Sequence, residues 1–148
     1  MGRILGLDYG RRRIGLAMSD PLQCIALPFE TWENTSIDHI LQKLSTLVSS
    51  HDIQILVVGL PITLKGERKK LAKEVERFCN HIKQKLDVPI VLWDERLTSV
   101  QAKRALIELN EKPSRNKGKI DRIAAVFILQ NYMDAHPKNL TTNKEEID

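Results

Sequence analysis

One run of the sequence restricts the fold more than any other. Residues 53–61 read IQILVVGLP, an almost uninterrupted apolar run that ends at glycine and proline. A run this short and this apolar is typical of a strand covered on both faces, as in parallel sheets. Amphipathic helical patterns lie on either side of it, at 37–48 and 67–86. A strand between two helices predicts βαβ units, and therefore an α/β fold around a partly parallel sheet.

The N-terminal segment has a different pattern. Three short apolar runs, at 3–10, 13–20 and 25–32, follow one another without a helix between them. The short connection YGRR predicts a hairpin between the first two runs, and Pro28 predicts that the third is an edge strand. An antiparallel meander therefore precedes the βαβ units.

The remaining elements complete a mixed sheet of five strands with helices on its faces. Residues 88–93 predict a last short buried strand, and residues 98–109 and 120–135 predict two further helices. The 148 residues suit one domain, which we place at 1–136, and the polar segment 137–148 predicts a flexible tail.

Composition restricts the compartment and the partners. The chain has 23 basic and 19 acidic side chains, and this net charge of +4 is compatible with nucleic acid as a partner without requiring it. Cys24 and Cys79 both lie in apolar surroundings and predict buried free thiols in a reducing compartment. A signal peptide and a membrane-length apolar stretch are both missing from the sequence, which predicts a cytoplasmic protein without a membrane partner.

Carboxylates stand where strands of such a sheet should end. Asp8 ends the first strand, and Asp94 and Glu95 follow the strand at 88–93. Sites in open α/β sheets form outside the carboxyl ends of strands, so we expect these acids to be neighbours. Asp121 shares the apolar face of the last helix with small residues that would let this helix lie close to the sheet. Asp121 could instead be a first-turn acid favoured by the helix dipole, and Asp94 a turn residue.

Carboxylates gathered without positive partners repel one another, and divalent cations relieve that repulsion. Oxygen ligands of this kind suit Mg²⁺ or Mn²⁺. Two such ions about 4 Å apart can activate water and stabilise the leaving oxygen of a phosphodiester. The sequence therefore predicts a site for two metal ions that acts on nucleic acid.

Basic residues lie where the same surface should continue. They flank the expected strand ends and the acidic residues, and the hairpin alone carries three consecutive arginines. Such charges bind phosphates without sequence preference, although each single arginine of the hairpin could equally be part of a solvated tip. The predicted nucleic-acid-binding residues are Arg11, Arg12, Arg13, Lys65, Arg68, Arg96, Arg115, Lys117 and Lys119, the last three in or near a polar loop expected at 110–119.

Four motifs in this order resemble the YqgF (RuvX-like) family of ribonuclease H-like proteins. They read LDYGRRRIGLAMSD, VVGLP, WDERLTS and DRIAA, and the resemblance extends from Arg3 to about Tyr132. The resemblance implies a ribonuclease H-like fold and a cytoplasmic nuclease that processes the 5′ end of pre-16S rRNA in ribosome biogenesis. It also implies that the catalytic and metal-binding acids are Asp8, Glu95 and Asp121.

Three other functions stay open. Family members are also described as Holliday junction resolvases acting on branched DNA, but RuvC-type resolvases carry a glutamate after the strand that corresponds to VVGLP, and this chain does not. The hairpin DYGRRRIG also resembles the phosphate hairpin of actin-like and sugar-kinase ATPases, which need two such domains. A non-catalytic nucleic-acid-binding module is the third alternative. The expected partners are pre-16S rRNA or branched DNA and ribosomal precursor particles, bound by a monomer or a weak homodimer.

Overall fold

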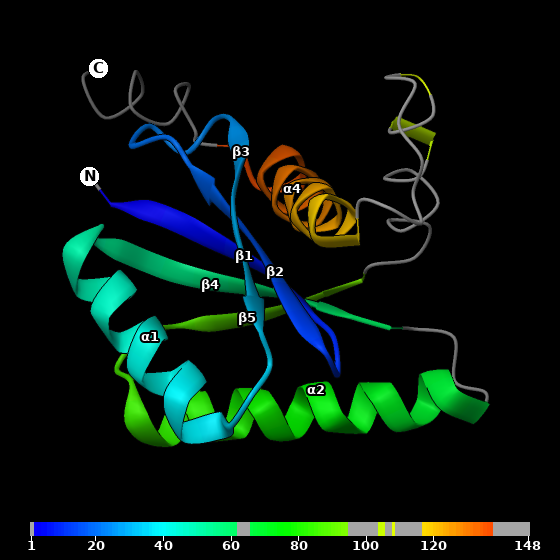
Figure 1. Ribbon diagram of the computed structural model, residues 1–148. Helices are drawn as coiled ribbons and strands as arrows, with labels where there is room; N and C mark the ends of the chain where they lie inside the picture. The colour runs from blue at the N-terminus through cyan, green and yellow to red at the C-terminus, as the bar shows by residue number, and fades with distance from the viewer. Residues whose placement is uncertain (1, 62–65, 95–103, 106–107, 109–116, 138–148) are drawn as a thin grey trace, which may run out of the picture.

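A five-stranded sheet forms the centre of the protein in the computed structural model, which describes residues 2–61, 66–94, 104–105, 108 and 117–137 (Figure 1). The strand order is β3-β2-β1-β4-β5. The strands are β1 (Arg3–Tyr9), β2 (Arg13–Ser19), β3 (Ala26–Glu33), β4 (Ile53–Leu60) and β5 (Ile90–Asp94). The helices are α1 (Ile37–Ser50), α2 (Gly66–Lys85) and α4 (Lys117–Ala135).

Strand pairing confirms the predicted mixed sheet. The strands β1, β2 and β3 form an antiparallel meander, whereas β4 pairs parallel to β1, and β5 parallel to β4. The edge position of β3 agrees with Pro28, because proline cannot donate a hydrogen bond to a second neighbouring strand.

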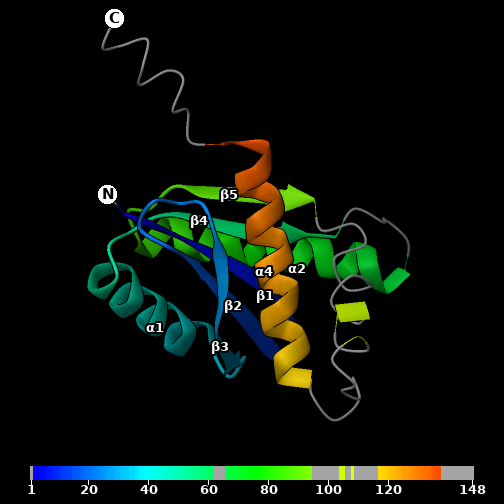
Figure 2. The ribbon, with the colours of Figure 1, turned by 90° about the horizontal axis from the view of Figure 1, so that it is seen from above.

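Helices cover both faces of the sheet, with α1 and α2 on one face and α4 on the other (Figures 1 and 2). Alternation along the strands divides the side chains between two cores. Leu5 and Leu7 of β1 pack with residues of α1 and α2, whereas Ile4 packs with residues of α4. The predicted two-sided burial of β4 is confirmed, because Leu56 and Val57 are both fully buried and belong to different cores.

The contact between α4 and the sheet is unusually close at two glycines. A Cβ atom on Gly6 would lie 2.7 Å from Cβ of Leu129, and one on Gly15 would overlap the backbone carbonyl of Asp121. Ala124 and Ala125 are buried on the same face of α4. Small residues on both partners therefore let the helix lie directly on β1 and β2, as expected from the apolar face of the sequence.

Three sequence-based expectations were wrong. Asp94 is the last residue of β5 and pairs with Leu60, so it belongs to the strand instead of following it. Lys117 and Lys119 lie in α4, which begins three residues earlier than predicted, and not in a loop. Cys24 is exposed in the β2–β3 connection, where its apolar neighbours Leu22 and Ile25 are exposed too, whereas Cys79 is buried as expected.

Two other expectations fall mainly outside the described residues. Of the helix expected at 98–109, residues 104, 105 and 108 are described, and all three are helical. The expected loop at 110–119 is described only from 117 onward, and the expected tail only at residue 137.

Candidate functional site

Gly15 adjoins both Asp8 and Asp121. Asp8 of β1 is the direct partner of Gly15 in β2, and directly opposed residues of an antiparallel pair project from the same face of the sheet. A Cβ atom on Gly15 would lie 2.9 Å from Cβ of Asp121. The missing side chain of Gly15 therefore makes room for one acid beside the other, although the two acids are 113 positions apart in the sequence.

Strand and helix periodicity place both acids on the same side of the sheet. In β1, Ile4 and Gly6 contact α4, and Asp8 follows them at the same two-residue spacing. In α4, Asp121 precedes the buried Ala125 and Ile128 by four and seven residues, which is one helical face. The predicted placement of Asp121 on the buried stripe is confirmed, and its side chain remains 19% exposed.

An arginine of the hairpin binds one of these acids. Nε of Arg13 donates a hydrogen bond to Oδ2 of Asp121 at 2.7 Å. The start of α4 is held on β3 as well, because the hydroxyl of Thr31 donates to the carbonyl oxygen of Gly118 at 2.6 Å and accepts from Nη1 of Arg122 at 3.1 Å. These contacts position the first turn of α4 above the end of the hairpin.

A second arginine of the hairpin binds the opposite helical layer. Nε of Arg11 donates to both carboxylate oxygens of Glu74 in α2, at 2.9 and 3.2 Å, and its Nη2 lies 2.7 Å from Oε2. The hydrogen bond from Arg11 is the main reason why the pKa of Glu74 is below its ordinary value. The hairpin is thus tied to α2 by Arg11 and to α4 by Arg13, whereas Arg12 between them is exposed.

Asp94 does not join the two acids on the α4 side. Its neighbour Trp93 faces α4, where its ring lies 5.5 Å from that of Tyr132. Since successive strand residues point to opposite faces, Asp94 projects toward the side of α1 and α2. The expectation that Asp94 would be a neighbour of Asp8 is therefore wrong, because the two side chains project from opposite faces of the sheet and β4 lies between their strands.

The other predicted site residues are described only in part. Four of them lie outside the described residues, namely Glu95, Lys65, Arg96 and Arg115. Arg68 is described only as part of the α2 backbone. Lys117 and Lys119 lie in the first turn of α4, within four residues of Asp121. Basic side chains therefore accompany the acids on the helix as well as on the hairpin.

The chemistry of the two acids fits a hard divalent cation. Carboxylate oxygens are the ligands that Mg²⁺ and Mn²⁺ prefer, and both acids lie on one face at the end of β1. Within the described part of the chain, three potential ligands of the His, Cys, Asp and Glu types do not come together at one point. A complete site therefore needs at least one donor from beyond these residues or from the substrate.

Sequence reasoning missed the part that Gly15 plays. The signal was present, because a glycine inside a strand pattern often marks a close backbone approach. Neither Gly6 nor Gly15 was interpreted in that way, although these two residues determine how closely α4 can approach Asp8.

None of the helices in the described part of the chain is long and apolar enough to cross a bilayer.

The comparisons with solved structures agree with the five-stranded mixed sheet and its helices. Thermus thermophilus RuvC in complex with a Holliday junction substrate gives a TM-score of 0.59 at 16% identity, covering 93% of this chain and 97% of RuvC. The fowlpox virus resolvase in complex with Holliday junction DNA gives 0.57 at 14% identity, covering 92% of this chain and 99% of the resolvase. At these identities the likeness establishes the fold, which is that of RuvC and ribonuclease H-like resolvases.

Sequence relatives are much closer. A protein of Trichormus variabilis named "Putative pre-16S rRNA nuclease" is 44% identical over 135 residues, covering 91% of this chain and 89% of the relative. A protein of Roseiflexus with the same name is 40% identical over 134 residues, covering 90% and 95%. Residues 2–135 also match the family described as "RuvX: Holliday junction resolvase". The predicted resemblance is confirmed: this chain belongs to the RuvX family of nucleases.

Proposed function

We propose that this protein is a metal-dependent endonuclease that processes the 5′ end of pre-16S rRNA. The observation that carries the proposal is the approach of Asp8 to Asp121 across Gly15, beside the arginines of the hairpin. The names of the relatives support the substrate, because the Trichormus and the Roseiflexus proteins both carry the name "Putative pre-16S rRNA nuclease".

The catalytic acids in this proposal are Asp8, Glu95 and Asp121. Asp8 and Asp121 contribute oxygen ligands from β1 and α4. We assign the third carboxylate to Glu95 in preference to Asp94, because Asp94 projects from the other face of the sheet. When bound, Mg²⁺ or Mn²⁺ would supply an activated water and stabilise the leaving oxygen of the phosphodiester.

Arginine and lysine side chains around the acids hold the polyanion. Arg12 is exposed at the tip of the hairpin, and Lys117 is exposed in the first turn of α4. Arg13 binds Asp121 instead of being fully exposed. Its guanidinium neutralises part of the charge of Asp121 and so reduces the repulsion between Asp121 and Asp8. The remaining predicted phosphate contacts are Arg11, Lys65, Arg68, Arg96, Arg115 and Lys119.

Cleavage of branched DNA is the second candidate, because the matching family is described as a Holliday junction resolvase. The sequence after β4 favours RNA instead. RuvC-type resolvases have a glutamate after the corresponding strand, whereas this chain continues with Pro61 and the residues ITLK. The family membership also favours a nuclease over the ATPase alternative.

The test is cleavage by the purified protein of two substrates, a precursor containing the 5′ end of 16S rRNA and a four-way DNA junction. Each is incubated with Mn²⁺, with Mg²⁺ and with EDTA. We expect cleavage of the rRNA precursor in either metal and none in EDTA. Preferential cleavage of the junction would support the second candidate. Binding of both substrates without any cleavage would contradict the nuclease and support the non-catalytic module.

A further inference from the structure

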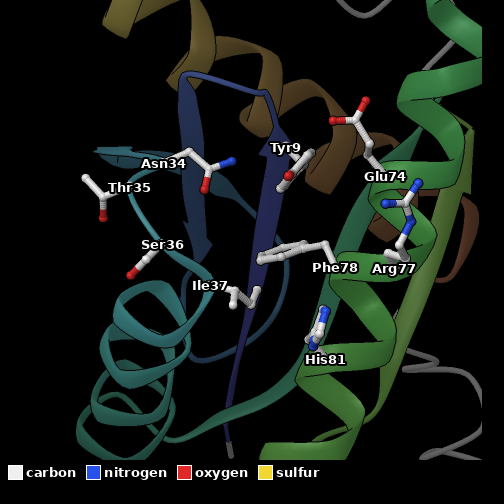
Figure 3. Close-up of a pocket in the computed structure, with 9 residues that line it drawn as sticks. All are labelled: Tyr9, Asn34, Thr35, Ser36, Ile37, Glu74, Arg77, Phe78 and His81. Carbon is white, nitrogen blue, oxygen red and sulfur yellow. The ribbon is translucent and has the colours of Figure 1, made fainter.

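A pocket lies at the end of β1 that carries Tyr9 (Figure 3). It is on the side of α1 and α2, whereas the two acids are on the side of α4. Its volume is about 240 Å³. Tyr9 of β1 forms one wall, the connection from β3 to α1 forms a second, and one face of α2 forms a third. The lining residues are Tyr9, Asn34, Thr35, Ser36, Ile37, Glu74, Arg77, Phe78 and His81.

The α2 wall combines an aromatic floor with cationic and polar groups. Arg77 and His81 are exposed, four residues apart on one helical face. Phe78 between them is buried, and its ring centroid lies 4.7 Å from that of Tyr9. The pocket therefore offers the half-buried ring of Tyr9 for stacking and a guanidinium for an anion.

Hydrogen bonds between the walls hold the pocket in shape. The side-chain Nδ2 of Asn34 donates to the carbonyl oxygen of Gly10 at 2.8 Å. The backbone N–H of Asn34 donates to the carbonyl oxygen of Arg12, also at 2.8 Å. The Arg11–Glu74 ion pair ties the same hairpin to α2. All three walls are thus joined through the hairpin, and a ligand would not have to order them.

The position of Tyr9 relates this pocket to the proposed catalytic site. Tyr9 directly follows Asp8, and neighbouring strand residues point to opposite faces from Cα atoms about 3.8 Å apart. Asp8 faces α4, whereas Tyr9 packs with the residues between α1 and α2. A single strand that crosses the end of β1 can therefore contact both faces with neighbouring nucleotides.

We propose that this pocket binds the nucleotide adjacent to the scissile phosphate in a single-stranded part of the substrate. The base stacks on Tyr9, and Arg77 binds the phosphate. The inference rests on the proposed function, since it uses Asp8 as the point of cleavage. The volume of about 240 Å³ is below the roughly 300–1,000 Å³ of sites that enclose a drug-sized ligand, so the pocket has room for one base and not for a longer stretch of RNA. Aromatic stacking combined with one cation is how single strands are bound without sequence preference.

The test compares two charge-removing substitutions on α2. Arg77→Gln removes the pocket cation, and Lys73→Gln removes an exposed cation of the same helix that does not line the pocket. Binding of a fluorescent RNA hexamer to the full chain is measured by anisotropy in EDTA at several salt concentrations. We expect Arg77→Gln to weaken binding about tenfold and to reduce the salt slope by about 0.7, the value for one single-strand phosphate contact. Lys73→Gln should change the affinity by less than about threefold, as for a distant charge in salt.

A second measurement locates the ligand. Uridine 5′-monophosphate and the hexamer are titrated separately while backbone amide resonances are recorded by NMR. We expect both to shift Tyr9, Thr35 and His81, with the hexamer binding at much lower concentration. Equal losses from the two substitutions, or no shifts at these amides at a saturating hexamer concentration, would overturn the proposal. Equal affinity for the mononucleotide and the hexamer would also overturn it, since the occupant would then be a free nucleotide.

These outcomes are independent of catalysis. Binding in EDTA is measured without cleavage, so the pocket can be confirmed even if the protein proves not to be a nuclease. Conversely, metal-dependent cleavage together with unchanged binding by Arg77→Gln would retain the nuclease and reject the pocket.

Discussion

Arg13 and Asp121 form an ion pair of 2.7 Å between the hairpin and the last helix. Their side chains are 32% and 19% exposed, so the pair lies at the surface of the proposed site and water screens it. The pair therefore contributes little to the free energy of unfolding. Its main effect is on the proposed metal site, because the guanidinium binds an oxygen of the carboxylate that we propose as a metal ligand.

Replacement of Arg13 should lower the stability of the protein only slightly and raise its affinity for metal. Arg13→Ala is expected to reduce the free energy of unfolding by less than about 1 kcal/mol, as for other exposed pairs. Affinity for Mn²⁺ should rise, because Oδ2 of Asp121 no longer has a competing cation. Urea unfolding and the electron paramagnetic resonance signal of free Mn²⁺ measure the two quantities.

Arg12→Ala is the matched control for that experiment, since Arg12 is exposed in the same hairpin. It should leave Mn²⁺ affinity within about twofold of the wild type, as expected for a solvent-screened charge. A weaker affinity for Mn²⁺ in Arg13→Ala would contradict the competition and would indicate that Arg13 only holds Asp121 in place.

The close approach at Gly15 predicts that even one methyl group is too large there. Gly15→Ala would place Cβ against the backbone of Asp121, so α4 must move away. We expect a loss of about 1–3 kcal/mol in the free energy of unfolding, measured by urea denaturation. Gly118→Ala is the control, because a Cβ there would have its nearest neighbour at 3.6 Å. Equal stability of the two variants would argue against the tight packing of α4 on β2.

The two cysteines should differ in reactivity. Burial raises the pKa of the Cys79 thiol to about 11, so little nucleophilic thiolate forms at neutral pH. Cys24 is exposed in the β2–β3 connection. Iodoacetamide at pH 8 should therefore modify Cys24 in the native protein and Cys79 only after unfolding, as followed by mass spectrometry. Modification of both thiols at similar rates in the native state would contradict the burial of Cys79.

Asp20 predicts a dependence of stability on pH. Its carboxylate accepts hydrogen bonds from the backbone N–H groups of Ile25 and Cys24, at 2.8 and 2.7 Å. These bonds, that of Ile25 first, hold the pKa of Asp20 below its ordinary value. The stabilisation is thus complete above the unfolded-state pKa of about 4 and is lost as the pH falls further.

Substitution isolates that contribution. Asp20→Asn should be less stable than the wild type at pH 7, and the difference in the free energy of unfolding should narrow at pH 3. Asp87→Asn, at an exposed position between α2 and β5, serves as the control. A difference that stayed constant with pH would exclude the charge of Asp20 as its source.

Local patterns made most of the fold predictable. The alternation of apolar residues in β1 and β2, the continuous run in β4 and the helical face of α4 are each visible within a few residues. Asp121 could be placed on the buried face of α4 for the same reason. The error at Cys24 came from tertiary contacts that local patterns do not contain. Cys24 was expected to be buried because its neighbours are apolar, yet the β2–β3 connection leaves Leu22 and Ile25 exposed as well.

The pairing of charges at the site could not be predicted from the sequence. Arg13 and Asp121 are separated by 108 positions, and Arg11 and Glu74 by 63. The three consecutive arginines were predicted to contact phosphates. That two of them also pair with acids of the helices was not visible in the sequence, because these pairs depend on how the helices pack. The face of Asp94 was missed for a simpler reason. The strand was expected to end at Trp93, which leaves the direction of Asp94 open, whereas Asp94 belongs to β5 and points to the face opposite that of Trp93.

In the proposed function, Asp8 and Asp121 act together at one metal-dependent site. The decisive experiment is single-turnover cleavage of the pre-16S rRNA precursor in Mn²⁺ by Asp8→Asn, with circular dichroism and RNA binding in EDTA as measures of the fold and of the phosphate contacts. We predict that cleavage is lost, while the fold and the affinity for RNA are largely retained. Cleavage at the wild-type rate by a correctly folded Asp8→Asn protein would contradict the claim.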